Sequence, residues 1–167
     1  MREILFRGKT IAIKSEWVEG FYNHIPCGRF LRDEHCIQTI DEGGRIGQLY
    51  DVYESTVGQF TGLTDKNGKK IFEGDIVKLS FEGTSREYDG DFSEYSYDID
   101  FDGHKIGIVT FGGYGTFLKV SHGELYIDGE KQEDWKPSRK SRLAAYRSEV
   151  IGNIHDNPEL LEVKDGN

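Results

Sequence analysis

Apolar and polar residues alternate along short segments of this chain, and glycines separate many of these segments. Ile4 and Phe6 share one face of a first predicted strand, and Ile11 and Ile13 share one face of a second. The aromatic and β-branched residues within Trp17–Tyr22 indicate a third strand. Together these segments predict an amino-terminal β meander.

The clearest local pattern lies in the centre of the chain. Asn67-Gly68 tolerates the positive φ angles of a tight hairpin turn, and apolar residues lie on both sides of it. After Gly74 the strand Asp75–Phe81 is predicted, with Val77 and Leu79 on the same face as Phe81. The pattern indicates a half-buried antiparallel strand.

The remaining segments predict further short elements. Strands are expected at 35–40, 106–111, 117–120 and 125–127, and turns at 43–44, 112–115 and 128–129. Helices are expected only at Ser138–Arg147 and Asn157–Leu161, where Asn157 provides a cap and Pro158 the first helical position.

Composition and charge narrow the class of protein. The chain has 167 residues, enough for one domain or two small ones, and its 21 glycines favour many tight turns. Its formal charge of −9 repels nucleic-acid phosphates and anionic lipid at long range, so contact with nucleic acid would require a local basic patch. We expect a cytoplasmic protein that has no membrane association, because there is neither a long apolar run nor a secretory signal. Cys27 and Cys36 are therefore expected as free thiols.

Three segments carry a resemblance to a known family. Met1–Lys9, Thr56–Leu79 and Glu149–Leu161 resemble, in this order, sequence blocks of the YopX family of phage and prophage proteins. The resemblance implies a gene of phage or prophage origin in a bacterial host cell, and it implies no particular activity, cofactor or catalytic residue. Two regions depart from the family blocks: 23–48, and 81–105 together with 130–148.

The resemblance also sets the expected architecture. It implies a mainly β, α+β fold with a small SH3-like barrel in the carboxy-terminal half, in which Asp75–Phe81 is an early strand. We expect an amino-terminal β-rich region at 1–58, and the barrel with loop insertions and a tail at 59–167.

Metal sites have weak support. His24 and Cys27 have an acceptable spacing for half a zinc site, but the adjacent His35 and Cys36 would point to opposite faces of a strand. The segment 98–103 matches the opening of a calcium loop, yet Val109 stands where the bidentate Glu is needed. An exposed strand with Ile99 and Phe101 directed inward explains the same residues. No metal is therefore expected at either site.

The best electrostatic candidate is a basic segment near a tryptophan. Five positive side chains could contact phosphates and an indole could stack on a base: Lys136, Arg139, Lys140, Arg142 and Arg147, together with Trp135. The alternative interpretation is a helix with a solvated basic face and inward-facing apolar residues. Nucleic-acid binding is thus possible but not favoured.

Enzyme chemistry is not indicated either. The five histidines are scattered and none belongs to a recognisable catalytic motif. Gly112–Gly115 is followed by a predicted strand and not by the helix that a phosphate-binding loop requires, so we expect a turn there. We therefore expect a non-catalytic module that binds a host or phage protein, with self-association as a further possibility because strand edges often pair with another chain.

Overall fold

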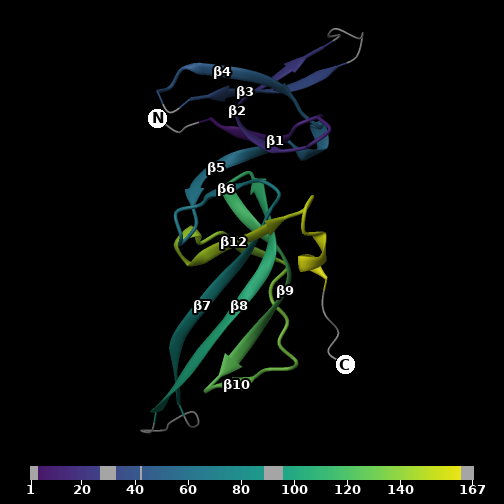
Figure 1. The fold of residues 1–167 in the computed structure, drawn as a ribbon. Coiled ribbons are helices and arrows are strands. Elements are labelled where there is room, and N and C mark those ends of the chain that lie inside the picture. Colours follow the sequence, from purple (N-terminus) through teal and green to yellow (C-terminus); the bar gives the residue numbers. More distant parts are fainter. Residues whose placement is uncertain (1–3, 27–32, 42, 89–95, 163–167) are drawn as a thin grey trace. The chain divides into compact units, whose positions relative to one another are not determined.

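The computed structural model describes residues 4–26, 33–41, 43–88 and 96–162, and its strands form two antiparallel sheets (Figure 1). Contacts divide the chain into unit 1, residues 1–63 and 70–73, and unit 2, residues 64–69 and 74–167. The domain boundary expected between residues 58 and 59 stays a prediction. The described residues contain no α-helix, so the mainly β part of the expectation is confirmed and its α+β part was wrong.

Unit 1 holds a six-stranded sheet in the order β4-β3-β2-β1-β5-β6. The strands are β1 (Phe6–Lys9), β2 (Trp17–Ile25), β3 (Glu34–Ile40), β4 (Ile46–Asp51), β5 (Gly58–Thr64) and β6 (Lys70–Phe72), and a 3-10 turn, η1, spans Glu54–Thr56. Leu5, Phe60 and Phe72 form a buried apolar cluster in this unit. The meander expected from the sequence is thus confirmed in outline.

One strand of the expected meander is absent. Ile11 and Ile13 are exposed, and residues 11–14 form bends. Thr10 closes this connection, because its N–H donates to the Glu16 carbonyl and its own carbonyl accepts from the Ser15 hydroxyl. The prediction of a strand at Ile11–Ile13 was wrong because two apolar residues at a spacing of two also fit the loop of a hairpin.

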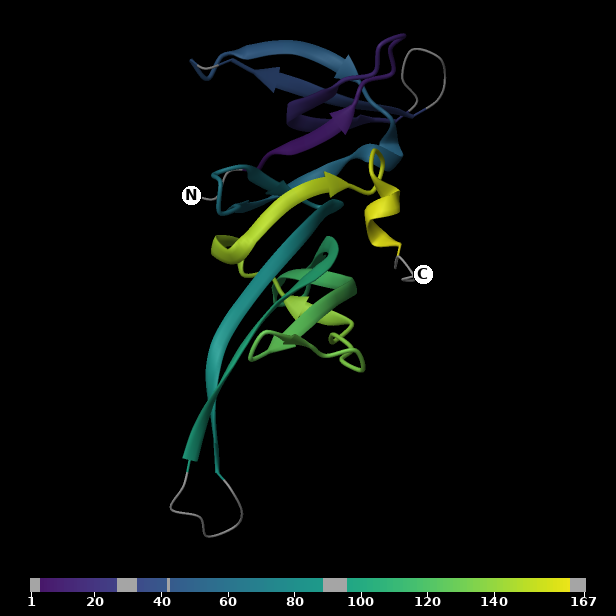
Figure 2. The same ribbon diagram turned by 60° about the horizontal axis from the view of Figure 1, so that its bottom comes forward.

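Unit 2 holds a curled sheet in the order β10-β9-β8-β7-β12, with β11 also pairing with β9 (Figure 2). The strands are β7 (Asp75–Tyr88), β8 (Ser96–Gly112), β9 (Gly115–Ile127), β10 (Glu130–Lys131), β11 (Lys140–Arg142) and β12 (Ser148–Asn153). Two 3-10 turns, η2 (Ala145–Arg147) and η3 (Pro158–Leu161), complete the unit.

β7 and β8 form a long hairpin in which pairing runs from Ile76 opposite Ile108 to Tyr88 opposite Ser96. β12 pairs with β7 only from Asp75 to Leu79, and β9 pairs with β8 only as far as Phe101. The far part of the hairpin, which we call the arm (Ser80–Tyr88 and Ser96–Phe101), therefore extends beyond β12, and its residues Ser96–Asp100 also extend beyond β9.

Tight turns lie where the sequence indicates them, between β5 and β6 and between β9 and β10. Gly68 has φ 82°, and Asp128 and Gly129 have φ 48° and 82°. Gly112 pairs with Gly115 across a hairpin turn, and a strand follows, so the expected turn in place of a phosphate-binding loop is confirmed.

The prediction of a helix at Ser138–Arg147 was wrong. Lys140–Arg142 is extended because it pairs with Phe117–Lys119 of β9, and only the short turn η2 follows. At the carboxyl end, η3 begins at Pro158 as expected, but the Asn157 side chain makes no capping hydrogen bond.

Candidate interaction groove

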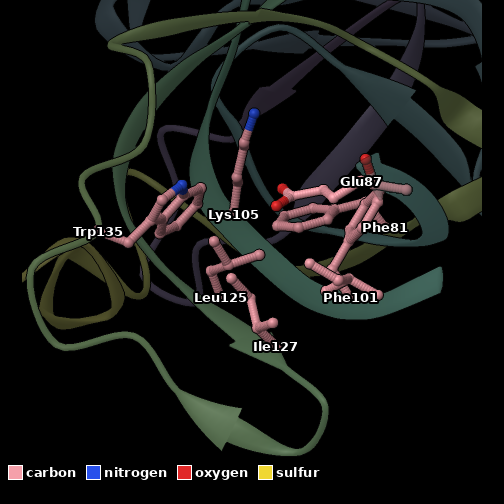
Figure 3. A pocket seen from close by; sticks show the side chains of 9 residues that line it. Phe81, Glu87, Phe101, Lys105, Leu125, Ile127 and Trp135 are labelled. Carbon is pink, nitrogen blue, oxygen red and sulfur yellow. The ribbon is translucent and has the colours of Figure 1, made fainter. Parts of the chain in front are cut away.

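An apolar groove of about 350 Å³ lies on one face of the unit 2 sheet. β7, β8 and β9 contribute its floor, and the segment after β10 contributes Trp135. The view in Figure 3 shows Trp135 on one side and the rings of Phe81 and Phe101 on the other, with Leu125 and Ile127 between them. The volume is at the lower end of the range of about 300–1,000 Å³ for ligand pockets, which is enough for one or two side chains.

The groove is a continuation of the hydrophobic core of unit 2. Val77 and Leu79 of β7 are buried, and Phe81 lies on the same face because side chains alternate along a strand. On β8, Val109 is buried and Phe101 lines the groove on the same face. One face of the sheet therefore contributes the core near β12 and the groove toward the arm.

A β-bulge keeps β9 in this arrangement. Ile106 pairs with His122 and Gly107 with Val120, so β9 has one extra residue at this point. The insertion changes which residues of β9 face the core, and so both the buried Leu118 and the groove residue Leu125 lie on the apolar face.

Two pairs of phenylalanine and glycine form the floor. Phe81 pairs with Gly103 across the hairpin, and Gly83 pairs with Phe101. A Cβ atom added at Gly83 would lie 2.7 Å from Cζ of Phe101, and one at Gly103 would lie 2.7 Å from Cζ of Phe81. Each ring thus lies flat over a glycine, and this leaves the space above the floor open.

Charged groups border the apolar surface. The Lys105 ammonium lies 5.5 Å from the centre of the Phe81 ring and donates a hydrogen bond of 3.2 Å to the Ser141 hydroxyl. The Trp135 ring packs against Phe81, with 5.9 Å between ring centres. Glu87 contributes a carboxylate at another point on the lining.

The opposite face of the arm is acidic. Asp98, Asp100 and Asp102 are exposed, whereas Ile99 and Phe101 line the groove, and so the exposed-strand interpretation of this segment is confirmed. Glu82 stands opposite Asp102, and neither forms an ion pair with a Lys or Arg of the described chain. Arg86 holds the pKa of Asp98 below its ordinary value through a side-chain hydrogen bond and its positive charge.

The basic segment is divided between two environments. Trp135 lines the groove, and Ser141 is on the groove side because it accepts from Lys105. Lys140 and Arg142 are exposed and point to the other side of β11, where the Lys140 ammonium lies 4.0 Å from the centre of the Phe117 ring. Arg139 and Lys136 are exposed as well. The structure therefore does not bring Trp135 together with Lys140 and Arg142 on one surface.

The residues considered for zinc lie in unit 1. His24 and His35 are cross-strand neighbours with stacked rings 4.9 Å apart, and the hydroxyl of Tyr22 lies 2.6 Å from Nδ1 of His35. Cys36 is buried, and its thiol donates to a carboxylate oxygen of Asp51 at 3.2 Å. Cys27 lies outside the described residues.

A different donor set was missed by the sequence reasoning. Glu34 and Asp51 each offer a carboxylate oxygen and Cys36 offers its Sγ, and these three atoms lie within 4.8 Å of one another. β3 and β4 bring them together because Cys36 pairs with Asp51 and Glu34 is two residues away on β3. Three such donors could hold a divalent metal ion in an incomplete coordination shell.

The fold and the groove define a class: a two-unit antiparallel β protein with an open aromatic groove. The family model described as YopX protein matches residues 29–162, and the chain belongs to this family, which confirms the resemblance seen in the sequence. Membership indicates a phage-type protein. A search of curated proteins and a search of solved structures each return no match to the chain. Within the described residues, no helix has the length and apolar composition needed to cross a membrane.

Proposed function

We propose that this YopX-family protein is a non-catalytic interaction module that acts inside the bacterial host and binds a host or phage protein through the groove of unit 2. The observation that supports this proposal most strongly is the continuity of the groove with the core. Phe81, Phe101, Leu125 and Ile127 lie on the face that buries Val77 elsewhere in the same sheet, yet they are only partly covered. Apolar surface that is left open in this way typically marks a binding site.

The charges of the groove favour a protein ligand over a nucleic acid. Lys105 is the one cation of the lining, and Glu87 offsets it. A single-stranded nucleic acid needs a positively charged path for its phosphates beside the aromatic rings, and Lys140 and Arg142 point away from Trp135. Binding of nucleic acid through Trp135, Lys136, Arg139, Lys140 and Arg142 is therefore the less favoured alternative.

A pair of glycine variants tests the proposal. Gly83→Ala adds a Cβ that displaces the Phe101 ring, whereas Gly113→Ala adds a Cβ with no atom within 4 Å. Tagged wild-type protein and both variants would be expressed in the host cell and purified, and the copurifying proteins would be identified. We expect one specific partner to bind wild type and Gly113→Ala and to be lost from Gly83→Ala. A partner retained equally by all three would contradict the proposal.

The nucleic-acid alternative has its own test. Wild-type protein would be titrated against single- and double-stranded DNA and RNA at low and moderate salt, because phosphate contacts weaken steeply as salt rises. We expect no salt-dependent binding. Binding that is lost on replacing Arg139, Lys140 and Arg142 with alanine would favour the alternative.

For the fold, we propose that unit 2 is related to SH3-like barrels. The curled antiparallel sheet of β7, β8, β9 and β12 supports this relation, and β7 contains the segment expected as an early barrel strand. Superposition of these strands on an SH3-like barrel in the same strand order would establish the relation, and a different strand order would exclude it.

A further inference from the structure

The arm of unit 2 exposes a long strand edge beside the groove. β12 pairs with β7 from Asp75 to Leu79, and in the described chain no strand pairs with that side of β7 from Ser80 to Tyr88. The other side of the same residues pairs with β8. Backbone N–H and C=O groups along such an edge are available to an added strand.

The two faces of this edge differ in chemistry. An added strand beside β7 would direct alternate side chains toward the groove, next to Phe81 and Gly83, and the others toward the acidic face, next to Glu82. Asp100 and Asp102 lie one strand further away, within reach of a long basic side chain. Near Gly83 the edge therefore presents an apolar surface on one face and negative charge on the other, whereas further along the arm Arg86 pairs with Asp98 on the acidic face.

Gly83 gives access to the groove from the edge. It has no side chain, and the Phe101 ring lies directly over it. An apolar side chain opposite Gly83 on an added strand would therefore contact the Phe101 ring, whereas any larger residue at position 83 would separate the two.

We propose that the partner segment is an extended peptide of alternating apolar and basic residues that adds to β7 along Ser80–Tyr88. The inference rests on the proposed interaction function and specifies the ligand of the same groove. Its apolar side chains enter the groove over Gly83 and Phe101, and its Lys or Arg side chains lie beside Glu82 and Asp102.

Charge argues against a second copy of this chain as the occupant. Two antiparallel β7 edges would be related by a two-fold axis perpendicular to the sheet, which places both acidic faces on the same side. Glu82 and Asp102 of the two copies would then repel, and each chain carries a formal charge of −9.

The test uses defined peptides with the full-length protein. The probe is a nine-residue peptide that alternates lysine and valine, and the controls are its glutamate–valine counterpart and a lysine–valine peptide that is N-methylated at every second residue. Affinity would be measured by calorimetry, and the binding surface by amide chemical shifts. We expect the lysine–valine peptide to bind about tenfold more tightly than either control, a difference of about 1.4 kcal/mol.

Variants separate the two faces of the edge. Gly83→Ala should weaken binding of the lysine–valine peptide by about fivefold or more without changing its salt dependence, because it affects the apolar face. The double variant Glu82→Gln, Asp102→Asn should reduce both the affinity and its salt dependence. Gly113→Ala should bind as wild type does. Amide shifts should concentrate on residues 80–88.

Other outcomes would overturn the inference. Failure of the lysine–valine peptide to bind, or amide shifts on β10 in place of β7, would show that no strand is added here. If the peptide fails to bind but the copurified host partner is still lost from Gly83→Ala, the proposed interaction function stands and only strand addition fails. If Gly83→Ala also retains the host partner, both proposals fail. Sedimentation equilibrium tests for a second copy of the chain. A dimer whose dissociation constant falls in the Glu82→Gln, Asp102→Asn variant would show that a second copy occupies the edge.

Discussion

Asp65 is the residue whose replacement should most clearly destabilise unit 2. It is buried, and its carboxylate accepts three backbone hydrogen bonds. Oδ1 accepts from the N–H groups of Asn67 and Lys69 at 2.8 and 2.9 Å, which closes the turn at Gly68. Oδ2 accepts from the N–H of Val150 in β12 at 3.0 Å, so one side chain joins two segments that are 85 residues apart.

The size of the effect follows from these contacts. In Asp65→Asn, the amide oxygen can replace Oδ1, but the NH₂ group then faces the N–H of Val150, and two donors meet without an acceptor. A buried donor left without an acceptor costs about 1–3 kcal/mol, and two hydrogen bonds that change from charged to neutral acceptors lose about 0.5–1 kcal/mol each. We therefore expect Asp65→Asn to lower the free energy of unfolding of unit 2 by about 2–5 kcal/mol.

The pH dependence has a definite sign. Burial acts to raise the pKa of Asp65, but the three backbone N–H groups and the charge of Lys69 outweigh it, and the pKa lies below its ordinary value. A lowered pKa means that the carboxylate stabilises the fold above its unfolded pKa of about 3.9, and that this contribution disappears as the pH falls through the folded pKa. The difference between wild type and Asp65→Asn should thus be constant from about pH 7 to 5 and shrink below about pH 4.

The two tryptophans allow this measurement on unit 2 alone. Trp17 lies in unit 1 and Trp135 in unit 2, so Trp135 fluorescence in a Trp17→Phe background reports urea unfolding of unit 2. Asp134→Asn is the matched control, because Asp134 is exposed, and it should change stability by less than about 0.5 kcal/mol. A loss below about 1 kcal/mol for Asp65→Asn, or a difference that grows below pH 4, would refute the reasoning.

Three further variants test the packing and the electrostatics. Gly20→Ala places a Cβ 2.0 Å from the carbonyl oxygen of Gln38, so unit 1, followed by Trp17 fluorescence, should lose at least about 2 kcal/mol; a stable variant would contradict the close strand approach. Leu118→Ala removes a fully buried side chain and should cost unit 2 about 2–5 kcal/mol in urea unfolding, whereas a loss under about 1 kcal/mol would place Leu118 outside the core. Burial and the charge of Lys78 lower the pKa of His104, so the stability of unit 2 should fall as the pH drops below about 6.5, and His104→Gln should flatten this slope; an unchanged slope would show that another group titrates.

Local patterns in the sequence predicted the turns and much of the strand content. Asn67-Gly68 and Asp128-Gly129 form turns because both pairs tolerate positive φ, and the positive φ values of Gly68, Asp128 and Gly129 agree. The alternation of Ile99 and Phe101 with aspartates also gave the correct faces of β8. These features depend on neighbouring residues only.

The parts that were missed depend on distant residues. Lys140–Arg142 was expected to be helical, and it is extended because β9 supplies pairing partners more than 20 residues away in the sequence. The metal-donor set of Glu34, Cys36 and Asp51 arises only when β3 pairs with β4. No local pattern contains this information.

One overlooked sequence signal is consistent with the groove but does not suffice to predict it. Phe81-x-Gly83 and Phe101-x-Gly103 are the same short pattern on two predicted strands. In an antiparallel hairpin with the right register, each phenylalanine lies opposite the other strand's glycine, as observed. The sequence does not specify that register, and so the flat aromatic floor could not be predicted.

Hydrogen–deuterium exchange on the complex with the copurified host partner tests the central claim most directly. We expect the partner to slow exchange of backbone amides in residues 80–88 of β7 and around Trp135, with little change at Lys119, Lys140 and Arg142. Protection confined to the basic face of β9 and β11, with β7 unchanged, would contradict it.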